Sequence, residues 1–166
     1  LDAMKASGDK FVMITAYDAT FARLASEAGA ETILVGDSLG MVLQGHETTI
    51  PVSLDAMTYH TECVARARPH SLIVADLPFM SFSNADDTLH ASTRLMQAGA
   101  QMVKLEGGTW LSDSIHRLVE RGVPVCDHLG LTPQSVNVFG GYRVQGRTPK
   151  EAKSILADAV EIQDAG

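Results

Sequence analysis

Short apolar runs, rich in Val, Ile and Leu, recur along the chain at nearly regular intervals. They show little alternation between apolar and polar positions, which is typical of strands that are buried on both faces of a parallel sheet. The pattern predicts five strands, at residues 11–16, 32–35, 71–75, 101–105 and 123–126.

Between these runs, apolar residues recur at intervals of three and four, as on one face of a helix. Two of the helical segments close on Gly29 and Gly122, and glycine is the residue that most often ends a helix. Their apolar positions are Phe21, Leu24, Ala25 and Ala28 in the first segment, and Leu111, Ile115, Leu118 and Val119 in the second. A weak repeat, EAGA at 27–30 and QAGA at 97–100, places a helix end before two of the predicted strands.

The clearest predicted helix start is the sequence TPKE at residues 148–151. Thr148 can cap the helix, Pro149 suits the first turn, and Glu151 can reach back to the N–H of the capping residue. The apolar positions that we expect on one face of this helix are Ile155, Leu156, Ala159 and Ile162.

Strict alternation of strands and helices predicts an α/β fold, either an open doubly wound sheet or a (β/α)8 TIM-type barrel. Neither GxGxxG nor GxxxxGK[ST] occurs, which weakens the nucleotide-binding open sheet and favours the barrel. A full barrel takes about 250 residues. We therefore predict that residues 1–166 form a single domain with about five strand–helix units, the N-terminal part of a barrel, and that the remaining units lie beyond residue 166.

The chain is 45% hydrophobic and 20% charged with a net charge of -7, the composition of a globular domain. The negative charge makes nucleic acid and anionic membranes poor candidates as partners. Cys63 and Cys126 form no CxxC motif and are expected to be reduced core thiols. Together with the lack of an apolar run near the roughly 20 residues that a membrane span needs, this favours a cytoplasmic location.

Three carboxylates stand at or just after the ends of successive predicted strands: Asp37, Asp76 and Glu106. The carboxyl ends of parallel barrel strands share one face, so these side chains can converge. Converging carboxylates repel one another unless a cation lies between them, and ligands that are all oxygen suit Mg²⁺. The alternative is that each acid only caps the helix that follows it.

Lys104 lies two residues before Glu106 on the same predicted strand, so both side chains point toward the barrel interior. Lys104 either forms a salt bridge with a neighbouring carboxylate or holds the carboxylate of a substrate. His128, which follows the fifth predicted strand, either donates a hydrogen bond to a ligand or satisfies a loop. The other histidines form no HExxH or Cys/His pattern, which argues against zinc.

Two long glycine-rich segments, residues 38–51 and 129–146, are expected to be functional loops on the same face. They belong to a series of motifs that covers nearly the whole chain and closely resembles the ketopantoate hydroxymethyltransferase family. The matching stretches are ITAYDATFA at 14–22, ILVGDSLGMVLQGHETTIPV at 33–52, VADLPFMSF at 74–82, MVKLEGG at 102–108 and HLGLTPQSVNVFGGYRVQGR at 128–147.

The resemblance implies a (β/α)8 barrel, usually a homo-oligomeric decamer, that uses Mg²⁺ and takes a hydroxymethyl group from 5,10-methylenetetrahydrofolate. Its implied substrate is 3-methyl-2-oxobutanoate and its product 2-dehydropantoate (ketopantoate), in pantothenate biosynthesis. Mg²⁺ would stabilise the enolate of the oxo acid. By motif, the implied metal ligands are Asp37, Asp76 and Glu106, and the implied substrate contacts are Asp37, Ser38, Asp76, Lys104 and His128.

Two features depart from the family pattern. The general base, a Glu at the end of the sixth strand, would lie beyond residue 166, so no catalytic base can be assigned in this chain. Asp127 stands where the family commonly has Gly, and this extra carboxylate either tightens the loop or disturbs substrate binding.

Two other readings remain. A Mg²⁺-dependent lyase or aldolase of the phosphoenolpyruvate mutase and isocitrate lyase type would explain the acids but not the GGYRVQGR segment, and it would use no folate. A non-catalytic fragment, inert or an assembly partner, would follow if five strands with unpaired edges were the whole protein.

Overall fold

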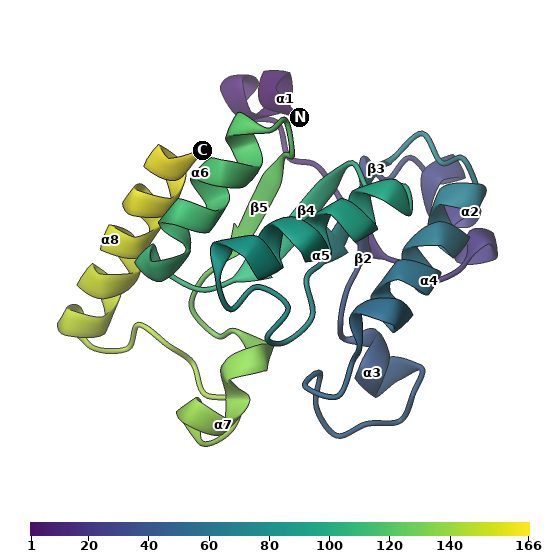
Figure 1. The fold of residues 1–166 in the computed structure, drawn as a ribbon. Coiled ribbons are helices and arrows are strands. Elements are labelled where there is room, and N and C mark those ends of the chain that lie inside the picture. Colours follow the sequence, from purple (N-terminus) through teal and green to yellow (C-terminus); the bar gives the residue numbers. More distant parts are fainter.

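The computed structural model describes the backbone of residues 1–166 and every side chain except that of Asp2. Strands and helices alternate along the chain, with short helices inserted in two of the connections (Figure 1). The strands are β1 (Met13–Thr15), β2 (Thr32–Val35), β3 (Leu72–Asp76), β4 (Met102–Glu106) and β5 (Val125–His128). The α-helices are α1 (Asp2–Ser7), α2 (Ala19–Glu27), α3 (Leu39–Val42), α4 (Leu54–Arg66), α5 (Ala85–Gln97), α6 (Ser112–Glu120), α7 (Val136–Phe139) and α8 (Pro149–Ala165), and the 3₁₀ helices are Thr109–Leu111 and Pro133–Ser135.

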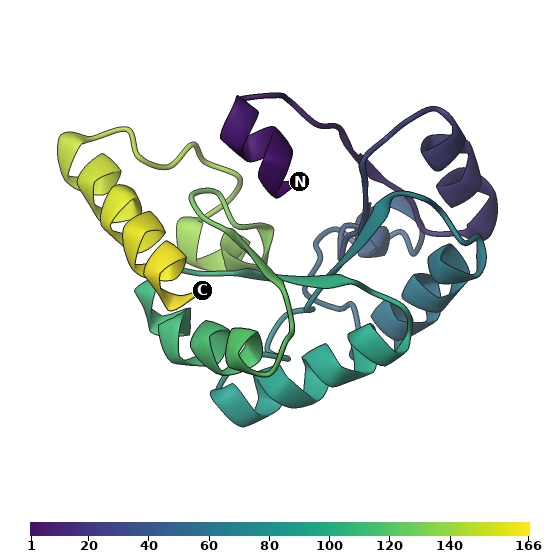
Figure 2. The same ribbon diagram turned by 90° about the horizontal axis from the view of Figure 1, so that it is seen from above.

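All five strands are parallel and lie in the order β1-β2-β3-β4-β5, so each strand pairs with its neighbours in the sequence. Helices α2, α4, α5, α6 and α8 form an arc around one side of the curved sheet, and α1 lies on the other side (Figure 2). A curved parallel sheet with this sequential order and outer helices is the arrangement of a (β/α)8 barrel. The predicted fold class is confirmed.

The core lies between the sheet and the outer helices. Ile33, Val35, Val103 and Leu105 point outward from the strands and are 0% exposed. The opposite, inner faces of the strands contact a pocket of about 450 Å³ beside Lys5 of α1. The site described below therefore lies on the inner side of the sheet, at the carboxyl ends of the strands.

Several helices begin where the side chain of a capping residue accepts a backbone N–H, as at Asp18, Ser53 and Asn84. At α8 the predicted capping box is present: Thr148 Oγ1 accepts from Glu151 N–H, and Glu151 accepts from Thr148 N–H. These caps satisfy N–H groups that the first turn of a helix leaves without partners.

Two expectations from the apolar pattern, one for β1 and one for α2, were wrong in detail. Strand β1 is not buried on both faces: Met13 and Ile14 are 41% and 40% exposed, because β1 lies at the edge of the sheet and only β2 pairs with it. In α2 the buried positions are Ala22 and Ala25, whereas Phe21 is 64% exposed, because the face of α2 that packs on β2 and α4 carries the two alanines.

The apolar face expected on α8 is only partly used. Ile162 packs against the core, but Leu156 is 68% exposed and no residue of α8 is fully buried. This helix lies at the end of the arc, next to α6, and has a neighbour on one side only (Figure 2). Among the residues that the structure describes, no helix is both long and apolar enough to cross a membrane.

Candidate functional site

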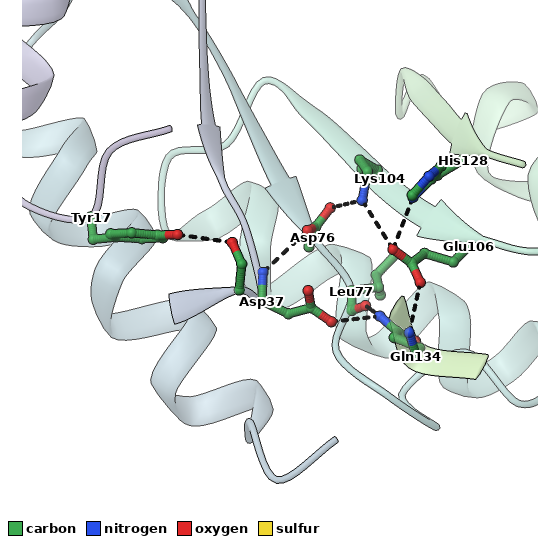
Figure 3. Close-up of polar contacts among 9 residues, drawn as sticks. Tyr17, Asp37, Asp76, Leu77, Lys104, Glu106, His128 and Gln134 are labelled. Carbon is green, nitrogen blue, oxygen red and sulfur yellow. Dashed lines mark hydrogen bonds and ion pairs between the residues drawn. The ribbon is translucent and has the colours of Figure 1, made fainter. Parts of the chain in front are cut away.

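The three predicted carboxylates lie at the same end of the sheet (Figure 3). Asp76 and Glu106 are the last residues of β3 and β4, and Asp37 comes two residues after β2. Although all three are charged residues, Asp37 is 3%, Asp76 4% and Glu106 6% exposed. Burial of three acids at one point is unusual for a structural site, because buried charges need partners.

Asp76 and Lys104 form the central ion pair of this cluster. Lys104 Nζ donates to Asp76 Oδ1 at 2.6 Å and lies 3.6 Å from Glu106 Oε1. The other oxygen of Asp76 accepts the backbone N–H of Asp37 at 3.1 Å. The salt bridge considered for Lys104 is therefore present.

Gln134 joins the two sides of the site and was not singled out from the sequence. Its Nε2 donates at 2.9 Å to Asp37 Oδ2 and also to the carbonyl of Leu77, and its backbone N–H donates to Glu106 Oε2 at 3.1 Å. Gln134 lies in the 3₁₀ helix that follows β5, within the long segment 129–146. The position of this segment after a strand was the available signal, but only the fold shows that the amide reaches Asp37.

The charges of the cluster are not balanced by the side chains that line it. Burial, and then repulsion from Asp76 and Glu106, raises the pKa of Asp37 from 3.8 to about 7. Burial lowers the pKa of Lys104, but the carboxylates of Asp76, Glu106 and Asp37 outweigh this and hold that pKa above its ordinary value. Three acids thus face one buried lysine, an arrangement that a further cation would stabilise.

Glu106 is the best stabilised of the three carboxylates. Burial raises its pKa, but the hydrogen bond from His128, the charge of Lys104 and the N–H of Gln134 together lower it below its ordinary value. Glu106 is therefore ionised at neutral pH, with both of its oxygens already holding hydrogen bonds.

His128 lies in the site, but its place in the chain differs from the prediction. It is the last residue of β5 rather than a residue after the strand, because the strand spans Val125–His128 instead of 123–126. Its Nδ1 lies 3.0 Å from Glu106 Oε1. The side chain remains 35% exposed, which leaves the imidazole accessible from the site.

Ser38 lies at the edge of the cluster, where its hydroxyl is 2.9 Å from the hydroxyl of Tyr17. Burial raises the pKa of Tyr17 above its ordinary value, so this phenol is neutral. Tyr17 follows β1, and the rule that predicted the acids, a polar residue just after a strand, would also have found it. The segment 38–51 thus reaches the site through Ser38, and it includes the short helix α3.

The donor set fits Mg²⁺. Its oxygens come from buried carboxylates with excess negative charge, and neither Cys nor an unshared imidazole lies among them. Among the described side chains, which exclude only that of Asp2, no group of three or more His, Cys, Asp or Glu is arranged to hold a metal ion. Mg²⁺ commonly binds through one or two carboxylates and keeps several waters, so two direct ligands such as Asp37 and Asp76 would suffice.

Asp127 faces away from this cluster. Successive residues of a strand point to opposite faces, and Asp127 lines a pocket with Ile115, Ala159 and Ile162 of the outer helices. Both of its carboxylate oxygens are buried without a hydrogen-bond partner, and burial raises its pKa from 3.8 to about 7. Of the two effects considered for this residue, direct disturbance of substrate binding has no support in the geometry.

The fold and the site together define a class: an α/β protein of the (β/α)8-barrel type with a buried acidic cluster and a lysine at the carboxyl ends of its strands. Residues 1–166 match the family model described as ketopantoate hydroxymethyltransferase. The chain belongs to this family.

Curated relatives carry a matching name. The chain is 60% identical over all of its 166 residues to a 3-methyl-2-oxobutanoate hydroxymethyltransferase of Burkholderia vietnamiensis and 58% identical to one of Pseudomonas aeruginosa. It covers 61% and 62% of these two proteins. The chain thus spans about three fifths of the length of the relatives that it matches.

Solved structures with a similar fold come from another group of proteins. A phosphonopyruvate hydrolase in complex with oxalate and Mg²⁺ superposes with a TM-score of 0.73 at 15% identity, over 97% of this chain and 57% of the other. A 2,3-dimethylmalate lyase of the phosphoenolpyruvate mutase/isocitrate lyase superfamily gives 0.66 at 14% identity, over 99% and 59%. At such low identity these similarities support the fold alone.

Proposed function

We propose that the full-length protein containing this chain transfers a hydroxymethyl group from 5,10-methylenetetrahydrofolate to 3-methyl-2-oxobutanoate, giving 2-dehydropantoate for pantothenate biosynthesis. The observation that carries the proposal is the buried cluster of Asp37, Asp76, Glu106 and Lys104, in a chain that matches this family from end to end. Such a cluster suits a small anionic substrate that binds together with a divalent cation.

In this proposal Asp37, Asp76 and Glu106 would hold Mg²⁺, Glu106 through a water molecule. Bound Mg²⁺ polarises the keto group of an oxo acid and stabilises the negative charge that develops there when C3 loses its proton. The pKa of Asp37 is raised first by burial and then by repulsion from Asp76 and Glu106, and a divalent cation would offset both by favouring the ionised carboxylate.

Lys104 is proposed to bind the carboxylate of the oxo acid. Its ammonium group is buried, charged and directed at the same point as the acids, so it could contact the carboxylate of an oxo acid bound at the metal site. Ser38, whose hydroxyl already contacts Tyr17, supplies a neutral donor beside Asp37. These contacts hold the substrate in one orientation, which places its C3 toward the donor of the one-carbon unit.

His128 is proposed to contact the substrate through its second ring nitrogen. Its Nδ1 is engaged by Glu106. This contact fixes the orientation of the imidazole, because with Nδ1 held by the carboxylate it is Nε2 that faces the site.

The catalytic base is proposed to lie outside this chain, on a Glu at the end of a sixth strand. The same proposal places the remaining strand–helix units of the barrel, and so the rest of the single domain, after residue 166. We further propose a cytoplasmic homo-oligomer, a decamer by family resemblance. Small molecules, rather than nucleic acid or a membrane, are its proposed ligands.

The second candidate is a Mg²⁺-dependent lyase or aldolase, for which the buried acids and Lys104 would serve equally well. Both candidates form an enolate from a 2-oxo acid, but only the first needs a folate. Formation of 2-dehydropantoate by the full-length protein, measured with and without methylenetetrahydrofolate, distinguishes them. Cleavage of a substituted oxo acid without any folate would instead support the lyase.

A further inference from the structure

A small pocket lies beside Glu106, and Lys104 is not among the residues that line it. It has a volume of about 130 Å³. Its lining comes from the connections that follow β3, β4 and β5 and from the end of β4: Phe79, Met80, Phe82, Ser83, Glu106, Trp110, Gln134 and Ser135. Drug-sized ligands occupy pockets of about 300 Å³ or more, so this one suits a single ring system of a larger molecule.

One wall of the pocket is an aromatic surface. The rings of Phe82 and Trp110 are stacked, with centroids 6.0 Å apart and planes at 16°. Phe82 is buried at 5% exposure, whereas Trp110 is 60% exposed. A Cβ on Gly107 would lie 2.8 Å from the indole carbons of Trp110, so only glycine allows the indole to lie there.

The polar part of the pocket offers acceptors and no cation. Gln134 is 6% exposed and its Oε1 is buried without a hydrogen-bond partner, although its Nε2 holds two. Glu106 contributes a carboxylate, and neither Lys nor Arg lines the pocket. An anionic oxo acid is therefore disfavoured here, and a flat neutral ring that carries N–H donors is favoured.

We propose that this pocket binds the bicyclic N–H-donating ring of the one-carbon donor, with one ring face against the Phe79, Phe82 and Trp110 side and its N–H groups toward Gln134 Oε1 and Glu106. The assignment rests on the proposed function, because only a folate-using enzyme requires such a ring. Glu106 then separates the two substrates, with the oxo acid on the Lys104 side and the ring on the Trp110 side.

The test measures the affinity of the full-length enzyme for tetrahydrofolate by calorimetry and the KM for methylenetetrahydrofolate and for the oxo acid by product formation. Trp110→Ala and Phe79→Ala should each raise the Kd and the donor KM by about tenfold, since stacking on an aromatic side chain contributes on this scale. The KM for the oxo acid should change by less than about twofold. Trp110→Phe, which keeps an aromatic face, should restore most of the affinity.

The Phe79→Ala variant distinguishes this pocket from a neighbouring one as the binding site of the ring. Trp110 also lines a larger pocket of about 350 Å³ with Ser154 and Asp158, whereas Phe79 lines only the smaller. Unchanged donor affinity in Phe79→Ala, with affinity lost in Ser154→Leu, would overturn the assignment in favour of the larger pocket. Phe21→Ala, which removes an aromatic side chain of 64% exposure from α2, is the matched control and should change neither KM.

The wild-type enzyme separates failure of this assignment from failure of the proposed function. If it forms product and binds tetrahydrofolate, but both pocket variants bind it equally well, only the placement of the ring is wrong. If it exchanges the C3 proton of the oxo acid yet neither binds tetrahydrofolate nor forms product, the folate donor itself is wrong and the assignment falls with it.

Discussion

Asp37 is the residue on which the metal proposal depends most, because its carboxylate carries the least compensated charge. With its pKa at about 7, the proton on Asp37 competes with a metal ion near neutral pH. We predict that the apparent Mg²⁺ affinity of the full-length protein is about tenfold weaker at pH 6 than at pH 8. Calorimetric titration at the two pH values measures this difference. Asp37→Asn should bind Mg²⁺ weakly at both, and equal wild-type affinity at pH 6 and pH 8 would contradict the role given to Asp37.

Lys104 distinguishes an internal salt bridge from a substrate contact. Replacing Lys104 with Met removes the ammonium group that contacts Asp76 and Glu106. If Lys104 binds the substrate carboxylate, the KM for the oxo acid should rise by about tenfold or more, because a charge-assisted hydrogen bond is lost. The KM for the folate donor should change much less. A normal oxo-acid KM in a folded variant would show that the lysine only neutralises the acids.

Asp127 should reduce stability at neutral pH. Its pKa is raised from 3.8 to about 7 in the folded protein, so the folded state holds a proton that the unfolded state releases. Its contribution is favourable below about pH 4 and is lost as the pH rises through 7. Asp127→Asn should therefore have an unfolding free energy about 1–2 kcal/mol higher than wild type at pH 8, a figure already reduced because the residue is partly exposed. At pH 5 the gain should be smaller. Urea unfolding at both pH values checks this, and an equal difference at the two would count against it.

The sequence predicted the residues at strand ends well and the links between them poorly. Asp37, Asp76 and Glu106 follow apolar strands, and parallel strands must bring such residues to one end of the sheet. Gln134 carries no comparable local signal, since its contact with Asp37 joins positions 97 residues apart. The sequence shows that Asp127 is an acid where the family commonly has Gly. Only its place in β5, where successive side chains point to opposite faces, shows that it faces the outer helices.

At the level of elements, the repeated EAGA and QAGA turns allow a paired experiment. Gly29 and Gly99 both adopt positive φ, at 92° and 111°, directly after a helix. A Cβ on Gly29 meets nothing within 4 Å, but a Cβ on Gly99 would lie within 2.4 Å of Ala65 Cβ. Gly99 therefore has a packing role that Gly29 lacks, although the two sequences look alike.

We predict that Gly29→Ala costs about 1 kcal/mol of unfolding free energy, from the left-handed backbone alone. Gly99→Ala should cost about 2–4 kcal/mol, because overpacking against α4 adds to the same strain. Equilibrium denaturation of the two variants measures the difference. Equal costs would mean that α4 and α5 adapt to the added methyl group.

The boundaries of the elements were harder to predict than their order. Strand β5 begins two residues later than its apolar run, so that Asp127 and His128 belong to the strand. Polar residues inside a strand interrupt the apolar pattern, and their pairing with Leu105 and Glu106 of β4 is visible only in the sheet. The long segments 38–51 and 129–146 likewise contain short helices that glycine-rich composition does not predict.

For the whole molecule, the alternation of strands and helices predicted a parallel sheet, and the absence of the nucleotide-binding glycine motifs favoured the barrel, whose sequential strand order the structure has. The exposed β1 edge, where Met13 and Ile14 contact no further strand, agrees with the proposal that more strand–helix units complete a barrel. Unpaired edges were expected for a sheet of five strands, but the exposure of Met13 and Ile14 was not, because the apolar run at residues 11–16 has the same composition whether or not a partner strand covers it.

In the proposed reaction, this cluster promotes loss of the C3 proton from a 2-oxo acid. The most direct measurement is exchange of that proton in 3-methyl-2-oxobutanoate, followed by NMR in D₂O with the full-length protein, with and without Mg²⁺. We predict exchange that requires Mg²⁺ and needs no folate. It should fall at least tenfold in Asp76→Asn, because metal and oxo acid are proposed to meet at Asp76. Absence of exchange in a folded protein shown to bind both Mg²⁺ and the oxo acid would contradict this prediction.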